Sequence, residues 1–288
     1  GKHIISTPLE HSSVSGTLTA LQEQGCEIDL VDIKRDGTID LDHLKELLRP
    51  DTIAVAVTMV DSELGTVQPV QEIAEILKAY PHCHFHVDAT QAVGKIPVSF
   101  EGVDTMSLTA HKFYGLNGIG LLLKRRNLAL EPLIHGGEST TLYRSGTPTV
   151  ALASSLALAL ELAVEQLPQH RDAVRKANDF LRAELSRYPK VRINSPENAI
   201  PQILNLSVQD VKGTVFQRAL DEKGVCVSVK SACSSDGMPS RAVFAVSRDR
   251  RNALSSWRIS LSHLTTEEDL RGFLAAFDAC YRELTETH

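Results

Sequence analysis

One stretch of the sequence reads Leu108-Thr-Ala-His-Lys-Phe-Tyr-Gly-Leu-Asn-Gly-Ile-Gly120, and it separates two apolar runs. The first run ends at Leu108 and the second begins at Leu121. Lys112 lies between them and is followed by three glycines within eight residues. Because burial disfavours the charged form of a lysine, two buried strands around Lys112 would favour its free amine, the form that attacks a carbonyl group. A surface lysine at a turn also fits this stretch, so the rest of the chain must decide.

Strands and helices alternate through residues 1–167. Short β-branched runs are typical of strands, and apolar residues spaced three or four positions apart are typical of helices. This alternation predicts an α/β fold with a mostly parallel sheet covered by helices on both faces. Ligands bind at the carboxyl ends of the strands in such sheets. We expect strands at 3–6, 26–33, 52–58, 83–87, 105–108 and 119–123, and helices at 12–24, 40–48, 68–79 and 149–166.

The character of the chain changes near Pro168, where a charged amphipathic helix at 172–187 begins a second part. Strands are predicted at 191–194, 202–207, 225–229 and 257–261. Thr265-x-x-Glu268 has the spacing of a capping box, which predicts the start of a last helix that ends near residue 286. The sequence therefore predicts a large domain at 1–167 and a smaller C-terminal α+β domain at 168–288.

The composition is that of an ordinary globular protein, with 42% hydrophobic and 23% charged residues in 288. A net charge of −6 argues against a nucleic-acid partner or an anionic membrane. The longest apolar runs are short or interrupted by polar residues, so we expect no membrane span. The N-terminus also lacks the charged and apolar regions of a signal peptide.

The five cysteines are widely spaced, and no two form a Cys-x-x-Cys pair. This pattern predicts neither a disulfide framework nor a structural zinc site, and it favours a reduced, cytoplasmic location. Cys233 stands apart because it lies in the small, polar stretch Ser231-Ala-Cys-Ser-Ser-Asp-Gly237, which is typical of an exposed loop. Lys230 is three residues away, where its charge would favour a reactive thiolate.

Several predicted strands of the first half are followed by polar side chains. Asp88 is placed to pair with a protonated pyridine nitrogen, which makes the ring an electron sink. Lys112 is suited to form an imine, and Gln91 to donate to a phenolate oxygen. His11 could stack on the ring, while Thr109 and His111 could hold a phosphate. Together these residues predict a site for pyridoxal 5'-phosphate.

Longer motifs identify a family. The chain resembles the pyridoxal-phosphate-dependent cysteine desulfurases of the class V aminotransferase superfamily, in the subgroup with a longer mobile cysteine loop. The resemblance implies the fold of type I pyridoxal-phosphate transferases and covers the chain from residue 1 to the last helix. It rests on Glu10-His11, Val87-Asp88-Ala-Thr-Gln91, Thr109-Ala-His-Lys-Phe-Tyr-Gly115, His135-Gly-Gly137, Arg144-Ser-Gly-Thr147, Ser231-Ala-Cys233 and Arg258-Ile-Ser-Leu261.

The resemblance implies a role for each matched residue. Lys112 would hold the cofactor and move the substrate α-proton, and His11 would assist proton transfer. Cys233 would take the sulfur of L-cysteine as a persulfide and leave L-alanine. Arg258 would bind the substrate carboxylate, and Thr147 would reach the phosphate from the other subunit of a homodimer. Asp88, Gln91, Thr109 and His111 would keep the cofactor contacts described above.

Three departures from the family pattern concern the anchoring of the cofactor. The family normally has a further N-terminal region, with a glycine-rich turn and a helix that receives the phosphate, before the position where this chain starts. Ser62 stands where the family has an asparagine near the ring, so this contact would be lost or bridged by water. Thr141 stands where an arginine is expected, and the glycine-rich turn before it reads Gly136-Gly-Glu-Ser-Thr140.

These observations leave three functions open. The first is a cysteine desulfurase that passes persulfide sulfur to an acceptor protein for iron–sulfur cluster assembly or thio-modification. The second is a lyase within the same superfamily that acts on selenocysteine. The third is a non-catalytic or partner-dependent subunit that does not bind the cofactor alone. A metal site at His82, His84, His86 and Asp88, which would share one face of a strand, is a weaker alternative.

Overall fold

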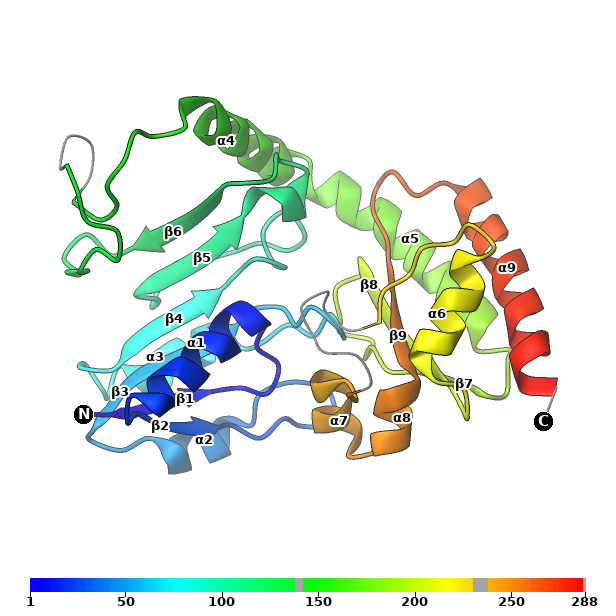
Figure 1. Ribbon diagram of the computed structural model, residues 1–288, viewed down its shortest axis with the longest axis horizontal. Coiled ribbons are helices and arrows are strands. Elements are labelled where there is room, and N and C mark those ends of the chain that lie inside the picture. The colour runs from blue at the N-terminus through cyan, green and yellow to red at the C-terminus, as the bar shows by residue number, and fades with distance from the viewer. Residues whose placement is uncertain (138–141, 230–237, 287–288) are drawn as a thin grey trace.

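The computed structural model describes residues 1–137, 142–229 and 238–286. A six-stranded sheet fills the first part of the chain, with the strand order β2-β1-β3-β4-β5-β6 (Figure 1). All neighbouring strands pair in parallel except β5 and β6, which are antiparallel. The predicted mostly parallel sheet is therefore confirmed. The strands are β1 (His3–Ser6), β2 (Glu27–Leu30), β3 (Thr52–Thr58), β4 (His84–Asp88), β5 (Thr105–Thr109) and β6 (Gly120–Lys124).

The helices of this part connect the strands close to the predicted positions. Asp40 caps α2, and its carboxylate accepts hydrogen bonds from the backbone N–H groups of Asp42 and His43. A short 3₁₀ helix, η1 (Ala110–Phe113), follows β5 directly and carries Lys112. The longer helices are α1 (Ser12–Glu23), α2 (Leu41–Leu47), α3 (Val70–Leu77) and α4 (Val150–Glu165).

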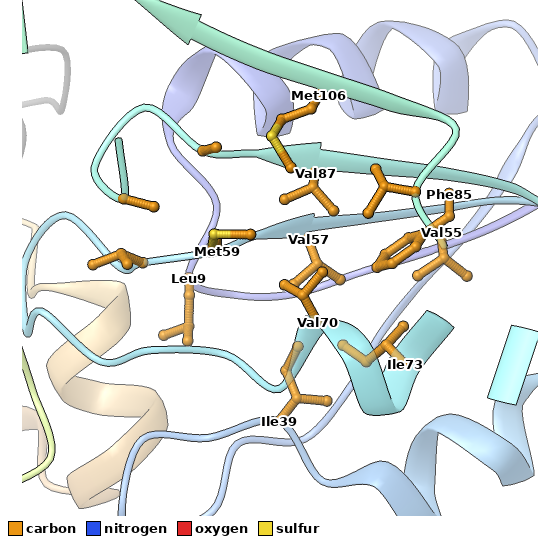
Figure 2. Close-up of a cluster of buried hydrophobic side chains, with 14 of the residues drawn as sticks. Leu9, Ile39, Val55, Val57, Met59, Val70, Ile73, Phe85, Val87 and Met106 are labelled. Carbon is orange, nitrogen blue, oxygen red and sulfur yellow. The ribbon is translucent and has the colours of Figure 1, made fainter. Parts of the chain in front are cut away.

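The core of the first part lies between the sheet and α3. Figure 2 shows Val57 of β3 and Phe85 of β4 on the side of the sheet that faces Val70 and Ile73 of α3. Phe85 is 1% exposed. The apolar spacing of α3 buries Val70, Ile73 and Leu77 together, since residues three or four positions apart share one face of a helix. This packing holds the central strands in place, and their ends form the site.

The second part contains a three-stranded antiparallel sheet of β7 (Val191–Ile193), β8 (Ile203–Val208) and β9 (Ser256–Ser260). An aromatic cluster supports it, in which the ring of Phe216 stacks on Trp257 at 5.1 Å. Ala242, Val243 and Ala253 belong instead to the core of the first part, so the two parts pack together. The helices are α5 (Leu167–Leu185), α6 (Gly213–Asp221), α7 (Arg241–Ser247), α8 (Arg250–Ser255) and α9 (Glu267–Glu286), and Figure 1 shows α9 at the far end.

Three local predictions are wrong. Residues 225–229 form only an isolated bridge at Ser228. The carbonyl of Val227 is occupied by a hydrogen bond from the Gln217 side chain, so it does not pair with a strand. The capping box is shifted by one residue: Thr266 and Asp269 exchange the two reciprocal hydrogen bonds. Strand β6 is largely exposed rather than buried, because it lies at the edge of the described sheet.

Among the described helices, none alone is long and apolar enough to cross a membrane. Helices α4 and α5 reach that length and apolar content only as a pair, across a bend of 69°. The predicted domain boundary between residues 167 and 168 coincides with the start of α5 and stays a prediction.

Replacing Phe85 tests the core between β4 and α3. We expect Phe85→Ala to lower the free energy of unfolding by about 3–5 kcal/mol, because a buried ring is lost and leaves a cavity. Phe85→Leu keeps most of the apolar volume and should cost less than about 1.5 kcal/mol. Urea denaturation followed by circular dichroism measures both values. A loss below about 1 kcal/mol for Phe85→Ala would show that this ring does not support the sheet.

Candidate active site

A cavity of about 910 Å³ lies at the carboxyl ends of the strands. Residues from both parts of the chain line it, including β9 and the segment before residue 230. The structure thus brings together most of the residues that the sequence marks as functional. These are His11, Ser62, Asp88, Gln91, Thr109, His111, Lys112 and Arg258.

Asp88 ends β4 on the wall of this cavity and is 6% exposed. Parallel register places it beside Thr58 of β3 and Ser107 of β5. The backbone N–H of Thr90 donates to its Oδ1 at 2.9 Å. A buried carboxylate with one donor among the described residues is suited to a cationic partner, and Asp88 lines the cavity where such a partner would bind.

Lys112 projects from η1 and lines the same cavity, but its side chain is exposed. Of the two interpretations of this stretch, burial between two strands is wrong and the exposed lysine at a turn is confirmed, because the chain leaves the sheet at Thr109 and forms η1. Tyr114 closes this turn with a left-handed backbone at φ 69°. Such a conformation is uncommon for an aromatic residue and indicates that the surrounding structure fixes the turn.

Thr109 and His111 contact each other beside Lys112. The hydroxyl of Thr109 donates to the carbonyl of Ile119 at 3.1 Å, and its oxygen lies 3.1 Å from Nδ1 of His111. Since the single hydroxyl hydrogen is committed to Ile119, Thr109 has no hydrogen left for an anion in this arrangement. The His111 ring is exposed, so it is the more accessible of the two groups to an anion.

His11 is the N-cap residue of α1. Its Nδ1 accepts a hydrogen bond from the backbone N–H of Ser13 at 3.2 Å. In a neutral imidazole one nitrogen accepts and the other carries the proton, so this bond places the His11 proton on Nε2. The helix start thereby fixes which nitrogen is available for proton transfer.

Arg258 reaches the cavity from β9. Its Nη1 donates to the carbonyl of Ser62, while its Nε is buried without a partner among the described residues. Burial lowers the pKa of Arg258, and the nearby Glu63 and Asp61 oppose this effect. Burial, followed by repulsion from Glu63, also raises the pKa of Asp61 to about 7. The unpaired Nε is suited to an additional anionic group, such as a carboxylate.

One predicted residue, Thr147, is not among those that line the cavity. Thr147 is exposed in the segment before α4, and its contact with a phosphate in a second subunit stays a prediction. Cys233 lies outside the described residues. Ser228 and Val229 do line the cavity, so the chain is described up to a point four residues before Cys233.

Glu10 belongs to this region, although no catalytic role is predicted for it. It is 4% exposed, and its Oε1 accepts from Thr7 and from the backbone of Thr58, while Oε2 has no partner among the described residues. Burial, together with the charges of Asp88 and Asp61, raises the pKa of Glu10 to about 8. Glu10 therefore carries a proton at neutral pH. The one signal for it in the sequence is its position directly before His11.

Two of the alternating histidines, His84 and His86, lie close to the hydroxyl of Thr105. Thr105 Oγ1 lies 2.7 Å from Nε2 of His84 and 2.9 Å from Nδ1 of His86, and His86 lines the cavity with Ser107. Burial lowers the pKa of both histidines. His82 precedes β4 and is exposed. Within the described part of the chain, no group of three or more potential ligands could hold a metal ion.

The pKa of Glu10 predicts how stability depends on pH. The folded chain keeps this proton up to about pH 8, whereas the unfolded chain loses it near pH 4.5, so Glu10 lowers the stability as pH rises between these values. We expect the free energy of unfolding of Glu10→Gln, relative to that of wild type, to rise by more than about 1 kcal/mol between pH 5 and pH 8.5. Urea denaturation at both pH values measures the gain, with the exposed Glu101→Gln as the matched control. Equal pH slopes for wild type and Glu10→Gln would contradict the protonated carboxyl.

The sequence of this chain is similar to those of known cysteine desulfurases. Residues 1–273 match the family Aminotransferase class-V. A cysteine desulfurase IscS of Dictyoglomus turgidum is 38% identical over an alignment of 289 positions, which covers 99% of this chain and 73% of that protein. Cysteine desulfurase IscS of Neisseria meningitidis serogroup A is 38% identical, over 94% of this chain and 68% of that protein.

Solved structures of similar proteins share the fold. A NifS-like protein superimposes with a TM-score of 0.90 at 33% identity, over 99% of this chain and 75% of that one. DndA from Streptomyces lividans superimposes with a TM-score of 0.78 at 31% identity, over 91% of this chain and 75% of that one. The resemblance seen in the sequence is confirmed, and the chain belongs to the class-V aminotransferase family.

Proposed function

We propose that the chain is a pyridoxal-phosphate-dependent cysteine desulfurase. One observation carries this proposal: the amine of Lys112, the carboxylate of Asp88 and the guanidinium of Arg258 line one cavity, and the segment that leads to Cys233 enters its wall. The names of the similar proteins from Dictyoglomus turgidum and Neisseria meningitidis support the same activity.

The described residues fit the ring of pyridoxal 5'-phosphate. Asp88 offers a buried carboxylate with a single backbone donor, which suits a protonated pyridine nitrogen. Lys112 offers the amine for the aldehyde, Gln91 a donor for the phenolate oxygen, and His11 a ring on the same cavity. When bound, the cofactor supplies an electron sink for the bonds at the substrate α-carbon.

The phosphate end fits less fully within this chain. Thr109 donates its hydroxyl hydrogen to Ile119, which leaves His111 as the exposed polar side chain next to Lys112. We propose that Thr147 of a second subunit completes the phosphate contacts in a homodimer. Ser62 holds Arg258 through its carbonyl and so contributes to the substrate side of the cavity.

The remaining residues account for the reaction on L-cysteine. Arg258 binds the substrate carboxylate, Lys112 moves the α-proton, and His11 serves in proton transfer through Nε2. The Cys233 thiolate attacks the substrate sulfur. A sulfur–sulfur bond forms while the bond between the substrate sulfur and the β-carbon breaks. The β-carbon gains a proton. L-cysteine loses one sulfur atom and Cys233 gains it, so L-alanine and a persulfide account for all atoms.

We further propose that the persulfide passes to an acceptor protein in the cytoplasm, for iron–sulfur cluster assembly or thio-modification. The name IscS of the similar proteins supports this destination. The sparse donors at the phosphate end favour one alternative, a desulfurase-like subunit that holds the cofactor only with a partner.

Capture of the cofactor is the first test. We expect the purified chain, titrated with pyridoxal 5'-phosphate, to develop a saturable visible absorption band from an imine, and Lys112→Ala to lose it. Lys78→Ala removes an exposed lysine of the helix C-cap and should leave the band unchanged. A chain that shows no band at any cofactor concentration would support the partner-dependent subunit instead.

Cys233 separates a desulfurase from other lyases. We expect Cys233→Ser to lower sulfide and alanine production from L-cysteine by at least about 100-fold, because a hydroxyl cannot take over the sulfur. Cys226→Ser changes an exposed cysteine that has no role in the proposed reaction and should retain activity. Turnover that survives in Cys233→Ser would remove this residue from the mechanism.

A further inference from the structure

Three rings from distant parts of the sequence meet beside the η1 turn. The ring of Tyr114, the residue that closes η1, meets the ring of His263 edge to face, with the ring centres 4.9 Å apart and the planes at 80°. Edge-to-face pairs of this kind attract each other. His263 also stacks on His170 of α5, with the ring centres 3.6 Å apart. None of these rings has a role above, although Tyr114 closely follows Lys112 in the chain.

The turn after β9 holds His263 on a fixed backbone. The N–H of Ser262 donates to the hydroxyl of Thr265 at 3.0 Å, and the N–H of Thr265 donates to the carbonyl of Ser262 at 3.1 Å. The N–H of Leu264 donates to the hydroxyl of Ser262 at 3.1 Å. His263 therefore projects from a turn that is held in shape and that directly follows the strand with Arg258.

Tyr114 is a residue that needs support. Its left-handed backbone, with a φ of 69°, is unfavourable for a residue with a side chain and persists only where the surrounding structure fixes it. The side chain is 60% exposed, so burial contributes little to holding it. Its contacts with the turn after β9 are the ring of His263 and a side-chain hydrogen bond with Ser262. The second part of the chain thus holds Tyr114 at two points.

The backbone of Tyr114 closes the turn that carries Lys112. The N–H groups of Tyr114 and Gly115 both donate to the carbonyl of Ala110, the first residue of η1. If Tyr114 moves, these two hydrogen bonds are lost and η1 opens. The direction in which Lys112 leaves the backbone then changes as well.

The His263 ring is suited to this contact as a neutral imidazole. Burial, and then the charge of His170, lower the pKa of His263. The ring is therefore uncharged at pH 7. Because an uncharged ring does not repel a charged neighbour, the stack on His170 persists at this pH whatever the charge of His170.

We propose that His263 is a positioning residue for Lys112: its ring holds Tyr114 from the second part of the chain and so keeps η1 closed. Because His263 follows β9, the same contact links η1 to the strand that carries Arg258. This inference rests on the proposed function, in which Lys112 captures the cofactor and Arg258 binds the substrate.

The first measurement uses the chain without cofactor, after treatment with hydroxylamine and dialysis. Hydrogen–deuterium exchange with mass spectrometry follows the peptide 110–116, which reports the opening of η1, and a peptide of β3, which reports the opening of the sheet. The variants are His263→Leu, which removes the ring, and His263→Phe, which keeps one. His82→Leu changes an exposed histidine ahead of β4 and is the matched control.

We expect His263→Leu to speed exchange in 110–116 by about threefold to tenfold, the factor that corresponds to one lost aromatic pair, with β3 unchanged. His263→Phe and His82→Leu should exchange at the wild-type rate. The proposal is overturned if His263→Leu exchanges like wild type, if β3 accelerates as much as η1, or if His263→Phe is as fast as His263→Leu.

Tyr114→Leu removes the contact from the other side and keeps the test decisive if His263→Leu does not fold. After correction for intrinsic exchange rates, it should accelerate 110–116 by a similar factor. The double variant should be no faster than either single variant, since both changes remove one contact. Effects that simply multiply would show that the two residues act independently, against the proposal.

A titration of the same variants with pyridoxal 5'-phosphate separates this inference from the proposed function. Where wild type shows the imine band, His263→Leu should need at least about threefold more cofactor for saturation, and His263→Phe should match wild type. An unchanged titration beside faster exchange would overturn the role of His263 toward Lys112. If wild type captures no cofactor while exchange in η1 still depends on the ring at position 263, the proposed function fails and the effect of His263 on η1 stands.

Discussion

The parallel pairing of β3, β4 and β5 is the constraint on which the site depends. Register places Thr58, Asp88 and Ser107 side by side at the carboxyl ends of their strands. Each strand then leaves the sheet into a loop or turn, and these carry Ser62, Gln91 and Lys112 to the same cavity. Because neighbouring side chains on a strand point to opposite faces, a shift of one residue in this register would turn Asp88 away from the cavity.

Negative charge at this edge of the sheet is controlled by protonation. Glu10, Asp61 and Asp88 are all buried there, and ionisation of all three together would be costly without cations. Glu10 avoids that cost by keeping its proton to about pH 8, and Asp61 keeps its own to about pH 7.

The sequence predicts the sheet and most of the cavity because both depend on local patterns. The apolar run 52–58 and the polar group that follows each strand identify Asp88 and Lys112 as neighbours in space. The stretch around Lys112 fitted both a buried and an exposed lysine, because the choice between them depends on the η1 turn by which the folded chain leaves β5, which is a tertiary property. The capping box failed by one residue since Thr265 and Thr266 offer equivalent hydroxyls, and only the folded chain selects Thr266. The unpaired oxygen of Glu10 likewise appears only when three strand ends meet.

A link between β9 and residue 228 joins the segment before residue 230 to the strand that carries Arg258. Ser228 and Arg258 exchange both backbone hydrogen bonds, at 3.1 Å and 2.7 Å, so they share one register. The guanidinium of Arg258 is fixed in turn to Ser62 of the first part. The segment that leads to Cys233 therefore starts from the same point that would bind the substrate carboxylate. A single pair of backbone bonds thus ties the last described residues before position 230 to the strand that carries Arg258.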